Sequence, residues 1–382
     1  MPEPVVNVPV AGGGGETERR LAVLAEVPQL RDAATPFLAV DLDAVDRNIG
    51  RLHGFFAGRP GRVRPHVKSH KCTAIARMQI DAGAHGVTCA TTDEVTAMVA
   101  AGIDDVLVSS VVTDRVRLRA LAAAAGVARV TATVDSAAAL ALLSEAADAA
   151  GVTVGIVIEC DIGMRRNGVG DVAEGLALAE AVARARGVTL RGVMAYEGHL
   201  IDNPDAEERA RVCVDAFGWP RQLLQELRRR GHEAPVLTGS SSATYDSTGV
   251  LPEMTDVQAG TYALMDPNYQ ALRPEFEQAL AVIGTVLTSR PDGRLIVDFG
   301  AKRVGTDWGH ARVAGLEAEC LYIAEEHAVF HVPGGSPLRV GERVAVLPPH
   351  ACTTMNLHRV AYGCRGGELD RPLAIDARDT YA

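Results

Sequence analysis

The chain has 382 residues, a formal net charge of −10 and 47% hydrophobic residues. This length and composition fit two folded domains and exclude a disordered or fibrous chain. The charge forms no basic stripe and no apolar run approaches the roughly 20 residues of a membrane span, so we expect neither nucleic acid nor membrane as a partner.

The two ends of the chain and its cysteines carry little pattern. The stretch from Pro2 to Glu16 is rich in Pro, Val and Gly, and we interpret it as a mobile tail. It lacks the basic segment and apolar core of a secretory signal. The seven cysteines are scattered without a Cys-x-x-Cys pair, which favours free thiols in a reducing compartment. We therefore expect a cytoplasmic protein.

After Pro36, short β-branched runs alternate with Ala-rich amphipathic stretches. A first strand is expected at Phe37–Leu42. Eight further strands are expected at Val63–His66, Gly86–Cys89, Asp105–Ser109, Arg129–Thr133, Thr153–Glu159, Thr189–Ala195, Val236–Gly239 and Asp256–Gly260. Helices are expected between them, for example at Thr92–Ala100, Ser136–Ala149, Val172–Ala185 and Glu207–Arg230. Eight strands with crossovers predict a (β/α)8 TIM barrel. The competing open sheet would need a Gly-rich loop after its first strand, where this chain has RPHVKSHK.

From about Ala279 the pattern changes to strand-like segments separated by Gly and Pro turns, with no helical stretch. Such segments are expected at Ala281–Thr288, Arg294–Asp298, Leu316–Ala324, Glu342–Leu347 and Leu373–Asp376. The sequence thus predicts an N-terminal segment over 1–34, a barrel over 35–275 and an all-β domain over 276–382. The part from Thr17 to Ala34 could belong to either domain.

Polar residues follow almost every barrel strand, at the end where such barrels form their active sites. They include Lys68, His70 and Lys71 after the first strand, Arg166 after the fifth, Tyr196 and His199 after the sixth, Ser240 and Ser241 after the seventh, and Gly260 and Thr261 after the eighth. Loops after the last two strands often bind phosphate, although a Ser-rich turn can equally cap a helix. A phosphate site with a lysine on another strand favours pyridoxal phosphate held by Lys68 as a Schiff base. Lys68 could instead be an ordinary solvated lysine, and Lys71 is the competing amine.

Six segments, RPHVKSHK, DIGMRRNGV, AYEGH, VQAGTY, VDFGAK and PPHACTTMNLH, resemble in this order the D-threonine aldolase and D-serine dehydratase family, a group of fold-type III pyridoxal-phosphate enzymes with an alanine-racemase-like barrel. The resemblance runs from about Thr35 to Ala377. It implies that Lys68 is the Schiff-base lysine, that Arg166 approaches the cofactor's phenolate oxygen and that Tyr196 lies near the cofactor. It also implies phosphate binding by Ser240, Ser241, Gly260 and Thr261, and metal binding by His350 and Cys352.

The His350 and Cys352 pair follows a strand-like segment, and side chains at i and i+2 of an extended chain face the same way. Nitrogen and sulfur ligands favour zinc, with manganese or magnesium as alternatives. A buried cysteine beside an unrelated histidine would give the same pattern, so the resemblance carries this assignment. Asp307 and His310 are further candidates near the site.

The reaction expected from the resemblance is that of a lyase acting on D-β-hydroxy-α-amino acids. We favour the D-threonine aldolase type, giving glycine and an aldehyde, with His199 or metal-bound water as the candidate catalytic base. D-serine dehydratase, giving pyruvate and ammonia, is the second candidate. Racemisation would leave the metal pair without a role, and a non-catalytic pyridoxal-phosphate-binding protein is a further alternative. By analogy with fold-type III relatives we expect a homodimer.

Overall fold

The computed structural model describes residues 15–378, which fall into two compact units. One unit holds residues 15–51, 69–74 and 261–378, and the other holds 52–68 and 75–260. The tail expected over Pro2 to Glu16 therefore lies, up to residue 14, outside the described residues. Within 15–378, no helix combines the length and the apolar content needed to cross a membrane.

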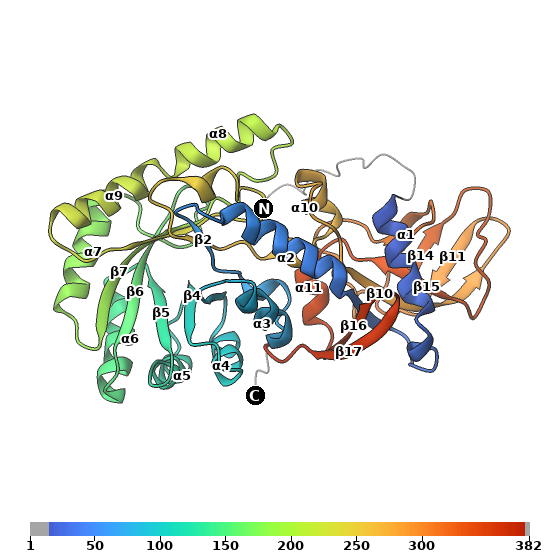
Figure 1. Cartoon of the computed structure of the whole chain (residues 1–382), viewed down its shortest axis with the longest axis horizontal. Helices are drawn as coiled ribbons and strands as arrows, with labels where there is room; N and C mark the ends of the chain where they lie inside the picture. The colour runs from blue at the N-terminus through green and yellow to red at the C-terminus, as the bar shows by residue number, and fades with distance from the viewer. Residues whose placement is uncertain (1–14, 379–382) are drawn as a thin grey trace. The chain divides into compact units, whose positions relative to one another are not determined.

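The second unit contains the predicted barrel. Its eight strands are β2 (Arg62–Val63), β3 (Val87–Cys89), β4 (Asp105–Val111), β5 (Arg129–Val134), β6 (Val154–Cys160), β7 (Val188–Ala195), β8 (Val236–Gly239) and β9 (Asp256–Val257). They form one sheet in the order β2-β9-β8-β7-β6-β5-β4-β3, and every pairing is parallel. Figure 1 shows β4 to β7 side by side. A parallel bridge between His66 and Thr88 joins the chain beyond β2 to β3, so the ring closes and the TIM-barrel prediction is confirmed.

Helical segments connect each strand to the next, and most of the helices begin after an N-cap residue whose side chain accepts a hydrogen bond. They are α3 (Thr73–Asp81), α4 (Thr92–Ala100), α5 (Arg115–Ala125), α6 (Ala137–Ala150), α7 (Val172–Arg184), α8 (Ala206–Ala216) and α9 (Gly218–Arg229), with α2 (Leu42–Phe56) before β2 and the single turn η4 (Thr248–Val250) before β9. The N-cap side chains of α4 to α8 accept hydrogen bonds from the first turn. The single helix expected over Glu207–Arg230 is wrong. The helix is interrupted at Phe217, because Pro220 has no N–H to donate to the carbonyl of Ala216.

The interior of the barrel is filled by apolar side chains. Strand β6 is buried along its whole length. Leu107, Val157 and Met194, from three neighbouring strands, form one buried cluster. This packing leaves the strand ends and their loops as the places where polar chemistry can occur.

A buried ionic network joins Arg64, directly after β2, to the first residues of β4 and β9. The Arg64 guanidinium donates to Asp105 Oδ1 at 2.9 Å, and its Nε lies 3.4 Å from Asp256 Oδ1. Burial raises the pKa of Asp256, but contacts with His85 and Arg64 outweigh it and hold this pKa below its usual value. A Cβ at Gly86 would lie 2.5 Å from the Arg64 Nη1, so only glycine allows this close packing. The network ties the two-residue strand β2 to β4 and β9.

We expect Arg64→Met to lower the free energy of unfolding by about 3 kcal/mol, because it leaves two buried carboxylates without their shared partner. Urea unfolding followed by circular dichroism measures the change. Arg115→Met is the control, because Arg115 and Glu145 form an exposed ion pair at 3.1 Å whose loss should cost less than about 1 kcal/mol. Equal losses in the two variants would contradict the role given to Arg64.

The first unit is built on a nine-stranded mixed sheet. Its strands are β1 (Phe37–Asp41), β10 (Leu280–Ser289), β11 (Arg294–Val297), β12 (Arg312–Val313), β13 (Glu319–Ile323), β14 (Ala328–His331), β15 (Arg343–Leu347), β16 (Val360–Arg365) and β17 (Glu368–Ala374). The main path runs β13-β14-β11-β10-β1-β16-β17, while β15 pairs with β10 and β12. All pairings are antiparallel except β1 with β16. The C-terminal β domain is confirmed, and β1, together with residues 261–275, clusters with it although the sequence assigned both to the barrel.

The short helical elements of the first unit, together with the turn η3 that leads into it, are α1 (Glu16–Ala22), η1 (Val23–Glu26), η2 (Pro28–Leu30), η3 (Val67–Ser69), η5 (Thr261–Ala263), α10 (Pro267–Leu272) and α11 (Ala351–Asn356). Leu21, Leu24 and Leu30 pack with Phe37 and Ile283 in one apolar cluster, which assigns the segment from Thr17 to Ala34 to this sheet. The expectation that the chain has no helix from about Ala279 onward is wrong. Helix α11 lies in this part of the chain and begins directly after His350, one of the two predicted metal ligands.

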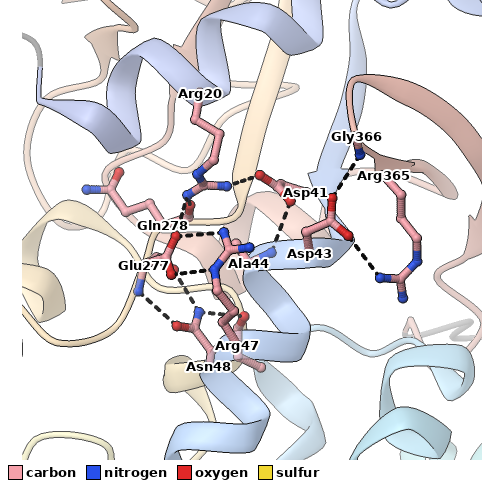
Figure 2. A network of polar contacts seen from close by, with 11 residues as sticks. Arg20, Asp41, Asp43, Ala44, Arg47, Asn48, Glu277, Gln278, Arg365 and Gly366 are labelled. Carbon is pink, nitrogen blue, oxygen red and sulfur yellow. Dashed lines mark hydrogen bonds and ion pairs between the residues drawn. The ribbon is translucent and has the colours of Figure 1, made fainter.

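Polar contacts fix the N-terminal helices of this unit to its strands (Figure 2). Arg20 contacts the carboxylate of Asp41 and donates to the carbonyl of Gln278 at 2.8 Å. Arg47 makes a two-pronged pair with Glu277 at 2.7 and 2.9 Å. The contacts hold α1 and α2 against the start of β10.

Candidate active site

The structure brings most of the predicted cofactor residues to one end of the barrel. Lys68 follows β2, Arg166 follows β6, Tyr196 directly follows β7, and the loop beginning at Ser240 follows β8. Because all eight strands are parallel, these positions share the carboxyl-terminal end of the sheet.

Lys68, Tyr196 and Arg166 form a cluster within the barrel unit. Lys68 lies on the single turn η3 and is exposed, and its Nζ is 5.7 Å from the centre of the Tyr196 ring. The guanidinium carbon of Arg166 is 5.8 Å from the same ring. An amine and a guanidinium thus lie within 6 Å of the centre of one tyrosine ring, while cofactor binding by these three residues stays a prediction.

The two candidate amines have different surroundings. Lys71 is buried, has a left-handed φ of 51° and belongs to the first unit, where its carbonyl accepts from the N–H of Ala377 at 3.0 Å. Lys68 is exposed at the end of the barrel that carries Arg166 and Tyr196. This placement favours Lys68 as the amine that an aldehyde could reach.

Arg166 is held by a carboxylate from the preceding strand. Its Nη2 lies 3.4 Å from Oε1 of Glu159, a buried residue near the end of β6. Burial raises the pKa of Glu159, and the positive charge of Arg166 opposes the rise. Glu159 thereby orients the guanidinium.

The loop after β8 is a compact hydroxyl network. Ser240 and Ser241 are both buried, and their hydroxyls lie 3.4 and 3.0 Å from the hydroxyl of Thr244. A Cβ at Gly239 would lie 2.2 Å from the carbonyl oxygen of Ala195, so glycine lets the loop begin close to β7. The loop offers the small residues and hydroxyls that a phosphate site needs.

Gly260 and Thr261, which are predicted to bind phosphate, both have structural contacts of their own. A Cβ at Gly260 would lie 2.7 Å from the carbonyl oxygen of His66, so close packing by itself requires glycine there. Thr261 is buried at the start of η5 in the first unit, and its carbonyl accepts from the N–H of Met265 at 2.7 Å. Phosphate binding by these two residues stays a prediction.

His199 is exposed and lies over the loop after β6. A Cβ at Gly163 would come within 2.8 Å of the His199 Nε2, so glycine makes room for the ring. Partial desolvation lowers the pKa of His199, against the charge of Asp161 that raises it. A neutral ring is able to accept a proton near pH 7.

His350 and Cys352 are brought together, but by a helix start and not by an extended strand. His350 is the N-cap of α11 with extended φ and ψ of −137° and 115°, while Cys352 already belongs to the first turn. Burial alone would lower the pKa of His350, yet its contacts with Cys352 and Asp307 raise that pKa to about 9. The two predicted ligands are therefore within hydrogen-bonding reach of each other.

Aromatic rings and a carboxylate fix the orientation of His350. Its Nδ1 lies 2.6 Å from Asp307 Oδ2, and its ring stacks on Trp308 with centres 4.1 Å apart. Asn268 donates to the carbonyls of Trp308 and Pro349, at 2.8 and 3.0 Å. Because Asp307 takes Nδ1, Nε2 is the nitrogen left for an ion, the arrangement found around many metal-binding histidines. His310 is exposed.

The chemical types of the side chains determine which cofactor or ion the Lys68 cluster and the His350–Cys352 pair fit. An exposed amine beside a guanidinium, with a hydroxyl-rich loop on the same unit, fits an aldehyde that carries a phosphate. An imidazole oriented by a carboxylate, with a cysteine sulfur in contact, fits a divalent ion of the zinc type. Among residues 15–378, no group of three or more His, Cys, Asp or Glu side chains is arranged to hold a metal ion.

Comparisons with known proteins agree with the geometry. Residues 40–266 match the alanine racemase N-terminal domain family, and residues 279–364 match a putative serine dehydratase domain. The chain is 33% identical to a D-threonine aldolase from an Arthrobacter species over 351 residues, which cover 90% of this chain and 92% of that protein.

Solved structures extend the likeness to the fold. The D-threonine aldolase from Filomicrobium marinum is 34% identical with a TM-score of 0.87, and the match covers 91% of this chain and 96% of that one. The D-threo-3-hydroxyaspartate dehydratase from Delftia sp. HT23 is 26% identical with a TM-score of 0.77, covering 92% and 98% of the two chains.

The chain belongs to the D-threonine aldolase and D-serine dehydratase family. It is accordingly a pyridoxal-phosphate-dependent lyase with the alanine-racemase-like barrel, and the non-catalytic alternative is set aside.

Sequence reasoning for this member of the family missed one buried group. Glu197, in the AYEGH segment, is fully buried and accepts hydrogen bonds from the loop after β8. The only signal for it in the sequence is its position directly after Tyr196, which does not reveal whether its side chain is buried.

Proposed function

We propose that this lyase cleaves D-β-hydroxy-α-amino acids of the D-threonine type to glycine and an aldehyde. The observation that carries the proposal is the cluster of Lys68, Tyr196 and Arg166 at the carboxyl-terminal end of the barrel. The 33% identity to a D-threonine aldolase supports the choice of substrate and reaction.

In this proposal Lys68 would be the attachment point of the cofactor, Arg166 would bind its phenolate oxygen and the loop from Ser240 would hold its phosphate. When bound, pyridoxal phosphate supplies a ring that takes up the electron pair left on the substrate Cα. His199 takes the proton of the substrate β-hydroxyl, so that the Cα–Cβ bond breaks as the C–O bond becomes a carbonyl. Partial desolvation favours the neutral ring that this step needs.

We assign the divalent ion to His350 Nε2 and Cys352, with zinc as the expected metal. When bound, the ion supplies Lewis acidity toward a hydroxyl oxygen. Asp307 and Trp308 keep the imidazole in the orientation that ligation needs. A solved D-threo-3-hydroxyaspartate dehydratase variant in which alanine replaces a cysteine is described as being in the metal-free form, which supports a cysteine ligand here.

D-serine dehydratase remains the second candidate, and one observation favours it. The part of the chain that carries His350 and Cys352 matches a putative serine dehydratase domain. In that reaction Lys68 would remove the Cα proton and hydroxide would leave from Cβ, giving ammonia and a keto acid after hydrolysis.

Product analysis separates the two reactions. The purified protein is incubated with pyridoxal phosphate, zinc or manganese, and D-threonine or D-serine, with L-threonine as the stereochemical control. We expect equal amounts of glycine and acetaldehyde from D-threonine and no product from L-threonine. Keto acid with ammonia would replace the aldolase proposal by the dehydratase, and turnover of L-threonine alone would contradict both. The homodimer and the cytoplasmic location stay predictions.

A further inference from the structure

Glu197 is a carboxyl group in the interior of the barrel unit that the proposed reaction does not use. It lies two residues beyond the end of β7 and directly after Tyr196, and its side chain is fully buried. Burying a carboxyl group is costly unless hydrogen bonds satisfy it. Its contacts should therefore show why the fold tolerates it.

The Glu197 carboxyl is bound by two hydroxyls of the loop after β8. Its Oε1 accepts from the hydroxyl of Thr244 at 2.5 Å and from that of Thr248 at 2.7 Å. The residues are 47 and 51 positions apart in sequence, so the bonds join the loop after β7 to the loop after β8. Oε1 of Glu197 thus fixes both ends of the segment from Thr244 to Thr248.

These bonds determine how the rest of the loop is arranged. Because the Thr244 proton is donated to Glu197, the Thr244 oxygen is left as an acceptor, and it receives the N–H of Ser241 at 3.1 Å. The Ser241 hydroxyl lies 3.0 Å from the same oxygen. A chain of hydrogen bonds therefore runs from the buried carboxyl to the two serines of the proposed phosphate loop.

The backbone of the loop needs such support. Ser240 has a φ of 66°, in the left-handed region that a residue with a side chain adopts only at a cost of about 1 kcal/mol or more. Such a conformation persists only where surrounding contacts fix it. Thr244 is the contact that both serine hydroxyls share, and Glu197 in turn fixes Thr244.

We propose that Glu197 is a positioning residue that fixes the loop over residues 239–248 in the shape that receives the cofactor's phosphate. The proposal rests on the phosphate site assigned under the proposed function. Glu197 touches neither phosphate nor substrate in this scheme and acts through Thr244 and Thr248. It follows that Glu197 matters for a cofactor with a phosphate and not for the same ring without one.

The test compares dissociation constants of pyridoxal phosphate and of pyridoxal, titrated into the cofactor-free protein and followed by visible absorbance. For Glu197→Ala we expect the constant for pyridoxal phosphate to rise about tenfold or more and that for pyridoxal to change less than about twofold. Glu197→Gln keeps an acceptor oxygen and should recover most of the phosphate preference. Exposed Glu233→Ala is the matched control and should leave both constants unchanged.

Thr248→Val provides a second variant of nearly unchanged shape, which keeps the test decisive if Glu197→Ala does not fold. It removes one of the two hydroxyl donors, so we expect a rise of about threefold for pyridoxal phosphate alone. Equal losses for both ligands, or no loss for either, would overturn the role of Glu197. A native protein that binds the two ligands equally well would instead overturn the phosphate site itself.

Discussion

Lys68→Ala is expected to abolish covalent attachment of pyridoxal phosphate and to lower activity about a thousandfold or more. Lys68 is the exposed amine next to Tyr196 at the barrel end, and alanine removes the only nitrogen of that side chain. The visible absorbance band of the lysine-bound cofactor measures attachment. A second measure is the amount of cofactor that stays on the chain after borohydride reduction and denaturation. Product formation from D-threonine measures activity.

Lys71→Ala is the matched control, since it removes an amine three residues away in the same segment. Lys71 is buried and its backbone carbonyl, which alanine retains, holds the N–H of Ala377. We expect this variant to keep the absorbance band. A band lost in Lys71→Ala and kept in Lys68→Ala would move the attachment point to residue 71 and remove the main observation behind the proposed function.

The barrel could be predicted from the sequence because its strands are buried on both faces and separated by capped helices. Strand β6, for example, is apolar along nearly its whole length and buried throughout. Strand position then locates the residues after each strand, which is why Lys68, Arg166 and Tyr196 could be placed together. What the strands pair with is less predictable. Phe37–Asp41 has the composition of a barrel strand, but it pairs with β10 and β16, 240 or more residues further along the chain.

The local structure around the metal candidates and the buried carboxyl could not be predicted in the same way. A helix of six residues, α11, is too short to produce an apolar period, so His350 and Cys352 looked like an extended pair. The buried Glu197 carboxyl accepts hydrogen bonds at Oε1 from Thr244 and Thr248, and those hydroxyls come from a loop about 50 residues later. The first feature is too short to give a periodic pattern, and the second depends on contacts distant in sequence.

Cys352→Ala is expected to reduce bound metal to background and to lower activity about a hundredfold or more while the cofactor band stays intact. His350 and Cys352 form the proposed ligand pair, so alanine leaves one of the two proposed ligands. Elemental analysis after gel filtration measures metal content, and visible absorbance measures the cofactor separately. Cys320→Ala is the control, because it removes another free thiol of the same unit that lies on β13.

Asp307→Asn is expected to weaken zinc binding without abolishing it. The amide keeps the size of the side chain but weakens its hydrogen bond to His350 Nδ1, which is 2.6 Å long in the native protein. Since groups that orient a ligating histidine contribute about 10- to 100-fold to metal affinity, we expect the dissociation constant for zinc to rise by that factor. The order of affinities should be native, then Asp307→Asn, then Cys352→Ala. Native metal content in Cys352→Ala would place the ion elsewhere, and an unchanged constant in Asp307→Asn would show that Trp308 stacking alone orients the imidazole.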